Sequence, residues 1–225
     1  MKKIIAVAAA LLCSAAVFAL DVSIGARGVF DIPAGTSIAG ESDPTGDFST
    51  KPFAAFGGGA FAFANFGLYS SGTGSVGIQP EIGFLYNQTR FQRESNNITY
   101  KTTTKYTSFE MPVLLTYRIN LGTISITPEI GPYLSIPMGK LNTSSKVTGW
   151  GSHSDSYNIN SKVILGGIIG TSVGVKMNDQ LDFVFDLRFM TDFQKLTTKE
   201  NSRETDIQTR RGLLFGVGVQ YNLSK

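Results

Sequence analysis

The stretch from Gly212 to Leu223, which reads GLLFGVGVQYNL, decides the fold of this chain. Every second residue from Leu213 onward is apolar, and the residues between them are mostly small or polar. The apolar set is Leu213, Phe215, Val217, Val219, Tyr221 and Leu223, and the other set includes Gly212, Gly216, Gly218, Gln220 and Asn222. A period of two is the pattern of a β-strand with one apolar face. This stretch therefore predicts a strand that has one apolar side and one side lined by small groups.

Seven further segments show the same alternation, which gives eight predicted strands in total. They are residues 20–30, 53–66, 76–87, 108–119, 124–134, 162–175 and 181–189. The segment 53–66 is rich in Ala, Gly and Phe, so its alternation leaves open which side is apolar. No segment after the N-terminus has the ~18 consecutive apolar residues of a membrane helix. The chain is predicted to be all-β.

The connections between these segments alternate strictly in length. Long polar connections occupy 33–52, 87–105, 138–160 and 191–209, and shorter ones occupy 67–75, 120–123 and 178–180. Transmembrane β-barrels have short turns on one side of the membrane and long loops on the other. The sequence therefore predicts an eight-stranded antiparallel up-and-down transmembrane β-barrel over residues 20–225. If the chain enters from the periplasm, all four long loops face outward.

The first 19 residues have the pattern of a secretory signal peptide. Lys2 and Lys3 precede an apolar run, and Val17-Phe18-Ala19 resembles a small-x-small cleavage site, so we expect cleavage after Ala19. The single cysteine, Cys13, lies inside this segment, and Leu12 before it argues against lipidation. We therefore expect a mature chain without disulfides, in the outer membrane of a bacterium.

The composition decides which strand face points inward. Charged residues make up 16% of the chain, against roughly 25% in soluble domains, and the polar strand faces carry Gly, Ser and Thr with few lysines. Their charges are mixed in sign, which suits a closed interior where ions pair. We expect a lumen polar network of Arg27, Glu81, Glu110, Arg118, Glu129, Asp186 and Arg188. The apolar faces would then contact lipid.

Two features near the strands carry further expectations. Phe84, Tyr86, Tyr106 and Phe109 lie near predicted outer strand ends, where they would form an aromatic girdle. Pro80, Pro112, Pro128 and Pro132 fall inside predicted strands, where each removes a hydrogen-bond donor. Rims or bulges would accommodate these prolines, and strand boundaries a few residues away from those predicted are the alternative.

Several short motifs resemble the outer-membrane β-barrel domain family of small OmpX-like and PorT-like proteins. They are Gln79-Pro80-Glu81-Ile82-Gly83, the segment from Phe109 to Leu115, Gly131-Pro132-Tyr133-Leu134 and Gly174-Val175-Lys176. The resemblance implies a barrel of eight to ten strands in a diderm outer membrane, and little about activity. The C-terminal stretch is similar to the signal read by the barrel assembly machinery, with Gly218, Tyr221 and Leu223 as its elements.

We expect no catalysis, no metal and no cofactor, and a structural or interaction role for the barrel. The single histidine, His153, lies between serines and next to Asp155, which leaves a lipid A-modifying enzyme as one alternative. A small pore through the lumen is the second alternative. The four long loops are the candidate sites for an extracellular ligand, and the net charge of +3 is too small to imply nucleic acid.

Overall fold

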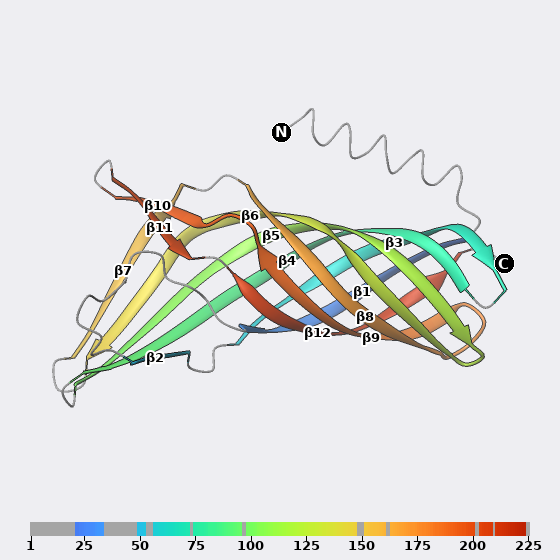
Figure 1. The fold of residues 1–225 in the computed structure, drawn as a ribbon, viewed down its shortest axis with the longest axis horizontal. Coiled ribbons are helices and arrows are strands. Elements are labelled where there is room, and N and C mark those ends of the chain that lie inside the picture. Colours follow the sequence, from blue (N-terminus) through green and yellow to red (C-terminus); the bar gives the residue numbers. More distant parts are fainter. Residues whose placement is uncertain are drawn as a thin grey trace.

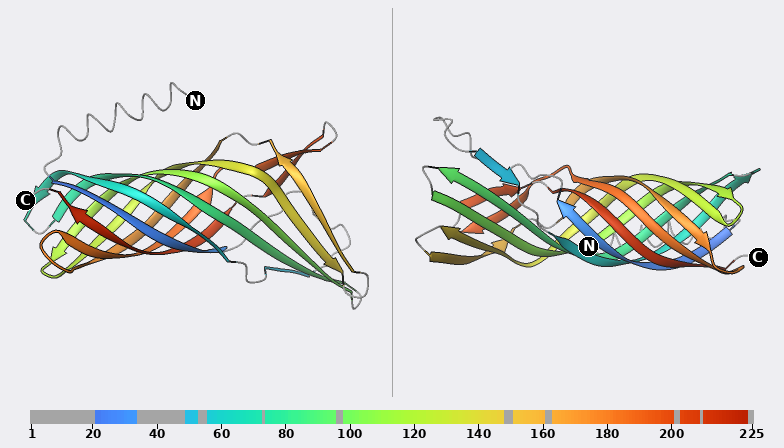
Figure 2. Two further views of the ribbon diagram at one scale, coloured as in Figure 1. Left: turned by 180° about the vertical axis from the view of Figure 1, so that it is seen from behind. Right: turned by 90° about the horizontal axis from the view of Figure 1, so that it is seen from below.

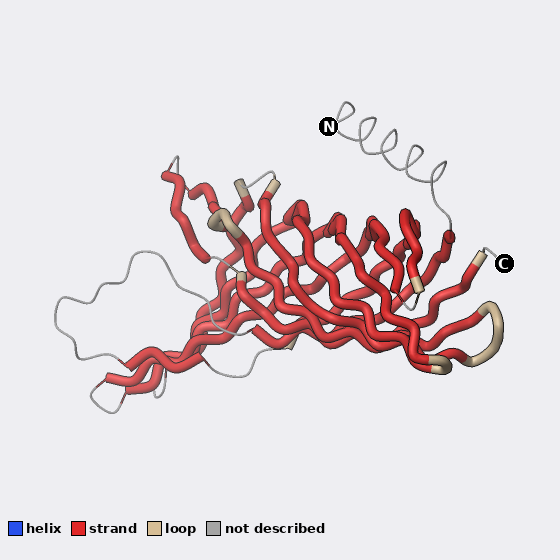
Figure 3. The backbone as a smooth tube through the Cα atoms, turned by 45° about the vertical axis from the view of Figure 1, so that its right-hand side comes forward, coloured by secondary structure: helices blue, strands red, loops and turns tan. Residues whose placement is uncertain are grey.

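The computed structural model describes residues 21–33, 49–52, 56–72, 74–95, 98–147, 151–160, 163–200, 203–208 and 210–223. The expected signal peptide lies outside these residues. The described chain is almost entirely β-structure (Figure 3). Its strands are β1 (Asp21–Pro33), β2 (Ser49–Pro52), β3 (Gly57–Ser71), β4 (Gly74–Ser95), β5 (Ile98–Leu121), β6 (Ile124–Val147), β7 (Gly151–Ile159), β8 (Ile164–Lys176), β9 (Leu181–Asp192), β10 (Leu196–Glu200), β11 (Arg203–Gln208) and β12 (Arg211–Asn222).

Eight of these strands close into a ring. The pairing runs β1-β3-β4-β5-β6-β8-β9-β12, and β12 returns to β1 with Arg27 opposite Gly218. All pairs are antiparallel, and the strands tilt against the long axis of the ring (Figures 1 and 2). This confirms the predicted eight-stranded up-and-down barrel. Closure leaves no open edge inside the ring, as a sheet in lipid requires.

One end of the barrel, which we name the turn end, carries tight turns. They lie at Gly72, Gly122 and the segment 177–180, and β1 begins and β12 ends there (Figure 1). Gly72 and Gly122 have φ values of 55° and 79°, which favour glycine. The connection predicted at 67–75 is much shorter in the structure, because β3 continues to Ser71 and β4 starts at Gly74.

The opposite end extends well beyond the ring, and we name it the extended end. β4, β5 and β6 are 22, 24 and 24 residues long, whereas about 10 residues span a membrane. β7 pairs with β6, β10 with β7 and β11, and β2 with β4 (Figure 1).

The prediction of loops at 87–105 and 138–160, and in much of 191–209, was wrong. These segments are mostly paired strands, because their Thr- and Ser-rich residues continue the ladders of the barrel. Most of 33–52 lies outside the described residues.

The outer surface of the ring is apolar and the lumen is largely polar, as predicted. Large apolar side chains such as Ile82, Ile169 and Phe215 are 44–56% exposed, while Glu81 and Arg188 are at most 3% exposed. Phe61 and Phe63 of β3 point into the interior, which settles the side that the sequence left open for this strand.

The expected aromatic girdle needs one correction. Phe84 and Tyr86 are exposed on the outer face, and the ring of Phe84 lies 5.1 Å from that of Phe109. Tyr106 is instead buried in the interior, because it shares the phase of Ser108 and Glu110 on β5. An odd separation from Phe109 puts it on the opposite side of the strand.

The four prolines lie within β4, β5 and β6, at neither the rims nor the bulges that the sequence suggested for them. The register between β5 and β6 is the same at Pro112, opposite Tyr133, and at Leu115, opposite Ile130. Pro128 and Pro132 pair by register with Thr171 and Gly167 of β8. Each missing donor is thus accommodated without a shift of the ladder.

Candidate functional site: the layered lumen

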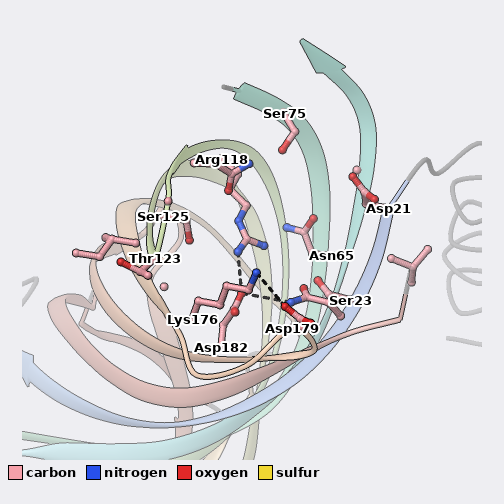
Figure 4. Close-up of a pocket in the computed structure, with 17 residues that line it drawn as sticks. Asp21, Ser23, Asn65, Ser75, Arg118, Thr123, Ser125, Lys176, Asp179 and Asp182 are labelled. Carbon is pink, nitrogen blue, oxygen red and sulfur yellow. Dashed lines mark hydrogen bonds and ion pairs between the residues drawn. The ribbon is translucent and has the colours of Figure 1, made fainter. Parts of the chain in front are cut away.

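The lumen opens at the turn end in a polar vestibule (Figure 4). This cavity has a volume of about 330 Å³ and is lined by residues from all eight ring strands, including Ser23, Asn65 and Ser125. Within it Arg118 donates to Asp182 at 2.7 Å, and Lys176 lies 3.4 Å from Asp179. Asn222 also donates to Asp182. The two bases of the vestibule are thus paired with two of its acids, and Asp21 is a third acid in the lining, so the field of the vestibule is mixed in sign.

A cluster of five ionic side chains fills the next level, and we name it the mid-barrel ion cluster. Its members are Arg27, Glu81, Glu129, Asp186 and Arg188. Arg27 donates to both oxygens of Asp186, at 3.0 and 3.1 Å, and also contacts Glu81. Arg188 donates to both oxygens of Glu81 and to Glu129, at 2.9 Å in each case. Two guanidinium groups therefore bridge three carboxylates.

The ion cluster is supported from the side by neutral groups. Gln79 donates to Glu81 at 2.7 Å, and Asn65 donates to Gln79 at 3.0 Å. The guanidinium of Arg27 lies over the ring of Phe63, 4.8 Å from its centroid. These contacts hold buried charges that would otherwise be costly to remove from water.

An apolar layer lies next to the mid-barrel ion cluster, on the side of the extended end. It consists of the buried side chains of Leu85, Leu114, Tyr133, Ile168, Met190 and Leu214, with Val29 packed against them. Along β1 the order is Arg27 and then Val29, and along β9 it is Arg188 and then Met190. An apolar layer across the lumen separates the ionic groups on its two sides.

A second ionic group, the upper ion cluster, lies beyond the apolar layer and has one guanidinium for several acids. Arg210 donates to Glu110 at 2.9 Å and lies 3.6 Å from Asp192. Ser108 and Ser135 also donate to Glu110, at 2.6 and 3.0 Å. The buried carboxylate of Asp31 lies at the same level of the lumen as Asp192. Asp31 follows Val29 on the inward face of β1, just as Asp192 follows Met190 on the inward face of β9.

Further apolar side chains fill the lumen toward the extended end. Tyr106, Leu141, Ile164 and Leu196 form a buried cluster, and Tyr157 and Ile159 of β7 pack against it. Polar and apolar levels thus succeed one another from the vestibule to the base of the extension. An eight-stranded ring leaves an interior that side chains can fill.

Glycines of the lumen face make room for the ionic side chains. A Cβ at Gly216 would meet the carboxylate of Asp186, and one at Gly218 would meet Arg27. A Cβ at Gly170 would lie 2.8 Å from Cγ of Arg188. The glycines on the inward face of the last strand therefore leave the space that the ionic side chains of the neighbouring strands occupy.

The seven residues predicted for the lumen network all lie on the interior face. Arg27, Glu81, Glu129, Asp186 and Arg188 come together, whereas Glu110 lies in the upper ion cluster and Arg118 in the vestibule. Four buried ionic residues were missed, namely Asp31, Asp182, Asp192 and Arg210. Asp182 already lies on the polar side of the predicted segment 181–189. The other three have the phase of predicted inward residues and lie one to three positions beyond the predicted segments, so a longer alternation would have included them.

The residues of the expected assembly signal lie on β12 and just after it. Gly218 faces the lumen, Tyr221 is exposed on the outer face opposite Ile24, and Leu223 is exposed beyond the strand. β12 closes the ring against β1. A role in assembly stays a prediction.

His153 lies on the exposed strand β7, where its Nε2 is 3.1 Å from Asp155. Alternation directs Ser152 and Ser154 to the other face of that strand. The register puts Ser145 of β6 opposite His153, and the Ser145 hydroxyl lies 3.4 Å from that of Thr102. Ser154 donates instead to Ser144. Within the described residues, no group of three or more His, Cys, Asp or Glu has the arrangement of a metal site. No helix in that part of the chain is long and apolar enough to cross a membrane.

A closed ring with an apolar exterior and a filled, ion-paired interior defines a transmembrane β-barrel. The chain matches the family model described as outer membrane protein beta-barrel domain over residues 24–198, and it belongs to this family. It is an outer-membrane β-barrel protein. No curated protein matches it.

Solved structures support the fold. OprG from Pseudomonas aeruginosa is 10% identical, with a TM-score of 0.56 over 92% of this chain and 98% of that one. Ail of Yersinia pestis is 15% identical with a TM-score of 0.37, over 90% and 98% of the two chains. Neisserial surface protein A is 13% identical with a TM-score of 0.37, over 89% and 96%. Of these three, the likeness to OprG is close enough to bear on the fold, and at this identity it carries no function.

Proposed function

We propose that this protein is a surface-display barrel, in which the closed ring anchors a rigid β-sheet extension outside the cell. The observation that carries the proposal is the continuity of β4, β5 and β6. Each strand runs from the lumen layers into the extension, so that Glu81 and Arg90 belong to one strand. About 12 residues of each strand exceed the membrane span, which corresponds to roughly 40 Å along the strand.

Paired strands make such an extension stiffer than free loops. The ladder of β4 and β5 is recorded up to Ser95 opposite Ile98, and β6 pairs with β5 and β7 up to Val147. A stiff surface loses little conformational entropy on binding, which favours a recognition role. The segments 87–105, 138–160 and 191–209 therefore supply the binding surface.

The lumen layers oppose the alternative of a pore. An ion passing from the vestibule would meet the mid-barrel ion cluster and then an apolar layer that includes Leu85, Leu114 and Met190. Planar-bilayer recording of the purified protein tests this, and we expect no single-channel conductance. Reproducible steps abolished by Leu114→Trp would revive the pore.

We propose the same export route as the sequence predicted. The leader ends at Ala19, the barrel assembly machinery receives the C-terminal strand, and the turn end faces the periplasm. N-terminal sequencing of the protein from outer membranes tests the cleavage. Leu223→Asp in the C-terminal signal is expected to reduce membrane insertion, whereas Ser71→Asp at a turn is expected to leave it unchanged.

Surface proteolysis of intact cells tests the display function. Trypsin is expected to cut at the extended end, where Lys101, Lys140 and Lys146 are exposed, and to spare Lys176 at the turn end. The uncut barrel should migrate faster on a gel before boiling than after it. Cleavage only after the outer membrane is opened would place the extension in the periplasm and overturn the proposal.

His153→Ala tests the enzyme alternative. We expect unchanged lipid A in cells that carry the variant, because Ser152 and Ser154 lie on the opposite face of β7 and the hydroxyl of Ser145, which faces His153 across the ladder, contacts Thr102. A loss of lipid A modification, with a normal amount of folded barrel, would contradict this.

A further inference from the structure

The polar vestibule at the turn end is a candidate binding site in its own right. Its cavity of about 330 Å³ reaches the lower end of the range of small-ligand pockets, and all eight strands of the ring contribute to its lining (Figure 4). The vestibule lies at the end of the barrel opposite to the extension. A ligand bound there would therefore serve a function distinct from surface display.

The lining of the vestibule is polar almost throughout. Of the residues that the structure places in it, none is aromatic, and only Val22 and Ile124 have apolar side chains. The side-chain amides of Asn65, Asn120 and Asn222 lie among the hydroxyl groups of serines and a threonine. Each amide can both donate and accept hydrogen bonds. This lining disfavours an acyl chain or an aromatic ring and suits a compact molecule with many polar groups.

The charges of the vestibule are divided between two sides of the ring. Asp21 of β1 and Asp182 of β9 flank β12. Lys176, opposite Asp182 in the register of β8 and β9, lies 3.4 Å from Asp179. Arg118 comes from β5, four strands away from β12 in both directions around the ring, and reaches across the lumen to Asp182 at 2.7 Å (Figure 4). The vestibule thus has an arginine on one side and three acids on the other, which we name the acid side.

Arg118 is positioned by Asp182 and still has donors to offer. Its side chain is 31% exposed, whereas that of Asp182 is 4% exposed and also accepts from Asn222. A guanidinium group carries five N–H donors, and the contact with Asp182 is made by Nη2. Planar guanidinium groups bind carboxylates through pairs of parallel hydrogen bonds. The exposed part of Arg118 therefore provides a site for the carboxylate of a ligand.

The overall charge of the lining argues against a ligand of one sign. Its two bases, Arg118 and Lys176, are fewer than its three acids. Cleavage after Ala19, as expected from the sequence, adds the α-ammonium of Leu20 next to Asp21 in the chain. Positive and negative charges are then equal in number, so the field of the vestibule favours neither a pure cation nor a pure anion. A molecule with one charge of each sign fits this lining.

We propose that the vestibule binds a short zwitterion, namely an amino acid or a dipeptide. The carboxylate of the ligand lies on Arg118, and its ammonium lies on the acid side at Asp21. The peptide group of a dipeptide meets the side-chain amides of Asn65 and Asn222, which reach the cavity from β3 and β12. Binding itself does not require the display function. Only the source of the ligand, the periplasm, follows from the orientation proposed above.

The test titrates diglycine into the isotope-labelled mature barrel, refolded in a nonionic detergent, and follows the side-chain amide signals of Asn65 and Asn222 by NMR. We expect saturable shifts with a Kd of roughly 1 mM, the affinity that two charge-assisted contacts supply. N-Acetyldiglycine lacks the ammonium and glycylglycinamide lacks the carboxylate, so each should bind at least about tenfold more weakly. Binding of diglycine should also weaken as salt is added.

Two variants remove the two halves of the site. Arg118→Gln/Asp182→Asn neutralises the pair, so that no buried carboxylate is left without its cation, and is expected to weaken diglycine binding roughly tenfold. Asp21→Asn, at an exposed position, is expected to weaken it several-fold. The matched control Arg211→Gln/Asp155→Asn removes one base and one acid toward the extended end and should leave the Kd unchanged. Heat-modifiable migration on a gel confirms that each variant is folded.

The capped ligands keep the proposal refutable even if a variant fails to fold. If N-acetyldiglycine or glycylglycinamide bound as tightly as diglycine, the vestibule would be a site for one sign of charge and the proposal would be wrong. It would also be wrong if both vestibule variants bound like the wild type, or if no saturable shift appeared at about tenfold the expected Kd. These measurements use the purified barrel, so their failure leaves the display function standing. Trypsin cleavage from the wrong side of the membrane would instead overturn the display function alone.

Discussion

Replacing Arg188 with methionine tests whether the mid-barrel ion cluster holds the barrel together. Its guanidinium donates to both oxygens of Glu81 and to Glu129, with N–O distances of 2.9 Å, and its side chain is 2% exposed. Arg188→Met leaves Glu129 without its cation and changes the cluster from two bases and three acids to one base and three acids. Methionine fills much of the same volume, so the loss is mainly electrostatic.

The expected cost is about 4 kcal/mol, because removing one partner of a buried pair costs roughly 3–5 kcal/mol. That corresponds to about a thousandfold change in the folding equilibrium. Urea titration of the barrel in phospholipid vesicles measures it, with the heat-modifiable gel band reporting the folded fraction.

The double variant Arg188→Met/Glu129→Gln provides the decisive control. It leaves one base and two acids, which restores the wild-type excess of a single acid, so we expect at least about 2 kcal/mol of the loss to be recovered, a coupling typical of residues in contact. Glu129→Gln alone should lower the stability only slightly, because Arg188 still pairs with Glu81. If Arg188→Met cost less than about 1 kcal/mol, or if the double variant were as unstable as the single, the electrostatic reasoning would be wrong.

Three further predictions use the same gel assay. Glu110→Gln should change stability by less than about 1 kcal/mol, because three acids face the single Arg210 and an amide oxygen still accepts the hydrogen bonds of the serines; a large loss would show that the carboxylate charge is needed. Gly216→Val should cost about 1–3 kcal/mol by overpacking the lumen, whereas Gly28→Ala, with nothing within 4 Å, should be neutral; equal effects would refute the packing argument. Ile169→Lys on the lipid face should cost about 2–4 kcal/mol, and an unchanged urea midpoint would contradict its contact with lipid.

The sequence predicted the ring well because the membrane imposes a strong contrast between two strand faces. Within the apolar band, Val217 and Gly218 differ in kind, so the period of two is visible. Beyond it both faces carry polar residues, and Thr103 and Thr104 are alike although only Thr104 is buried. The strands of the extension were therefore read as loops.

The missed ionic residues have a related cause. Asp192 follows Phe189, the last apolar residue of its predicted segment, and Arg210 precedes Leu213, the first apolar residue of the last strand. At these ends the contrast between apolar and polar positions, which reveals the alternation, is lost. Their pairing depends on the ring, since Arg210 reaches Glu110 and Asn87 on strands far away in the chain. Sequence phase could place these side chains inside, but only the closed barrel decides which of them meet.

The mid-barrel ion cluster also has a consequence for the order in which ion pairs form during assembly. Arg27 comes from the first strand and its partner Asp186 from β9, 159 residues later in the chain. Until the ends of the sheet meet, a growing ribbon in the bilayer would hold this guanidinium away from one of its counterions. The pairing of Arg27 with Asp186 and the closure of the ring are thus a single late event. A partly inserted sheet is therefore unstable, and the finished barrel is difficult to open.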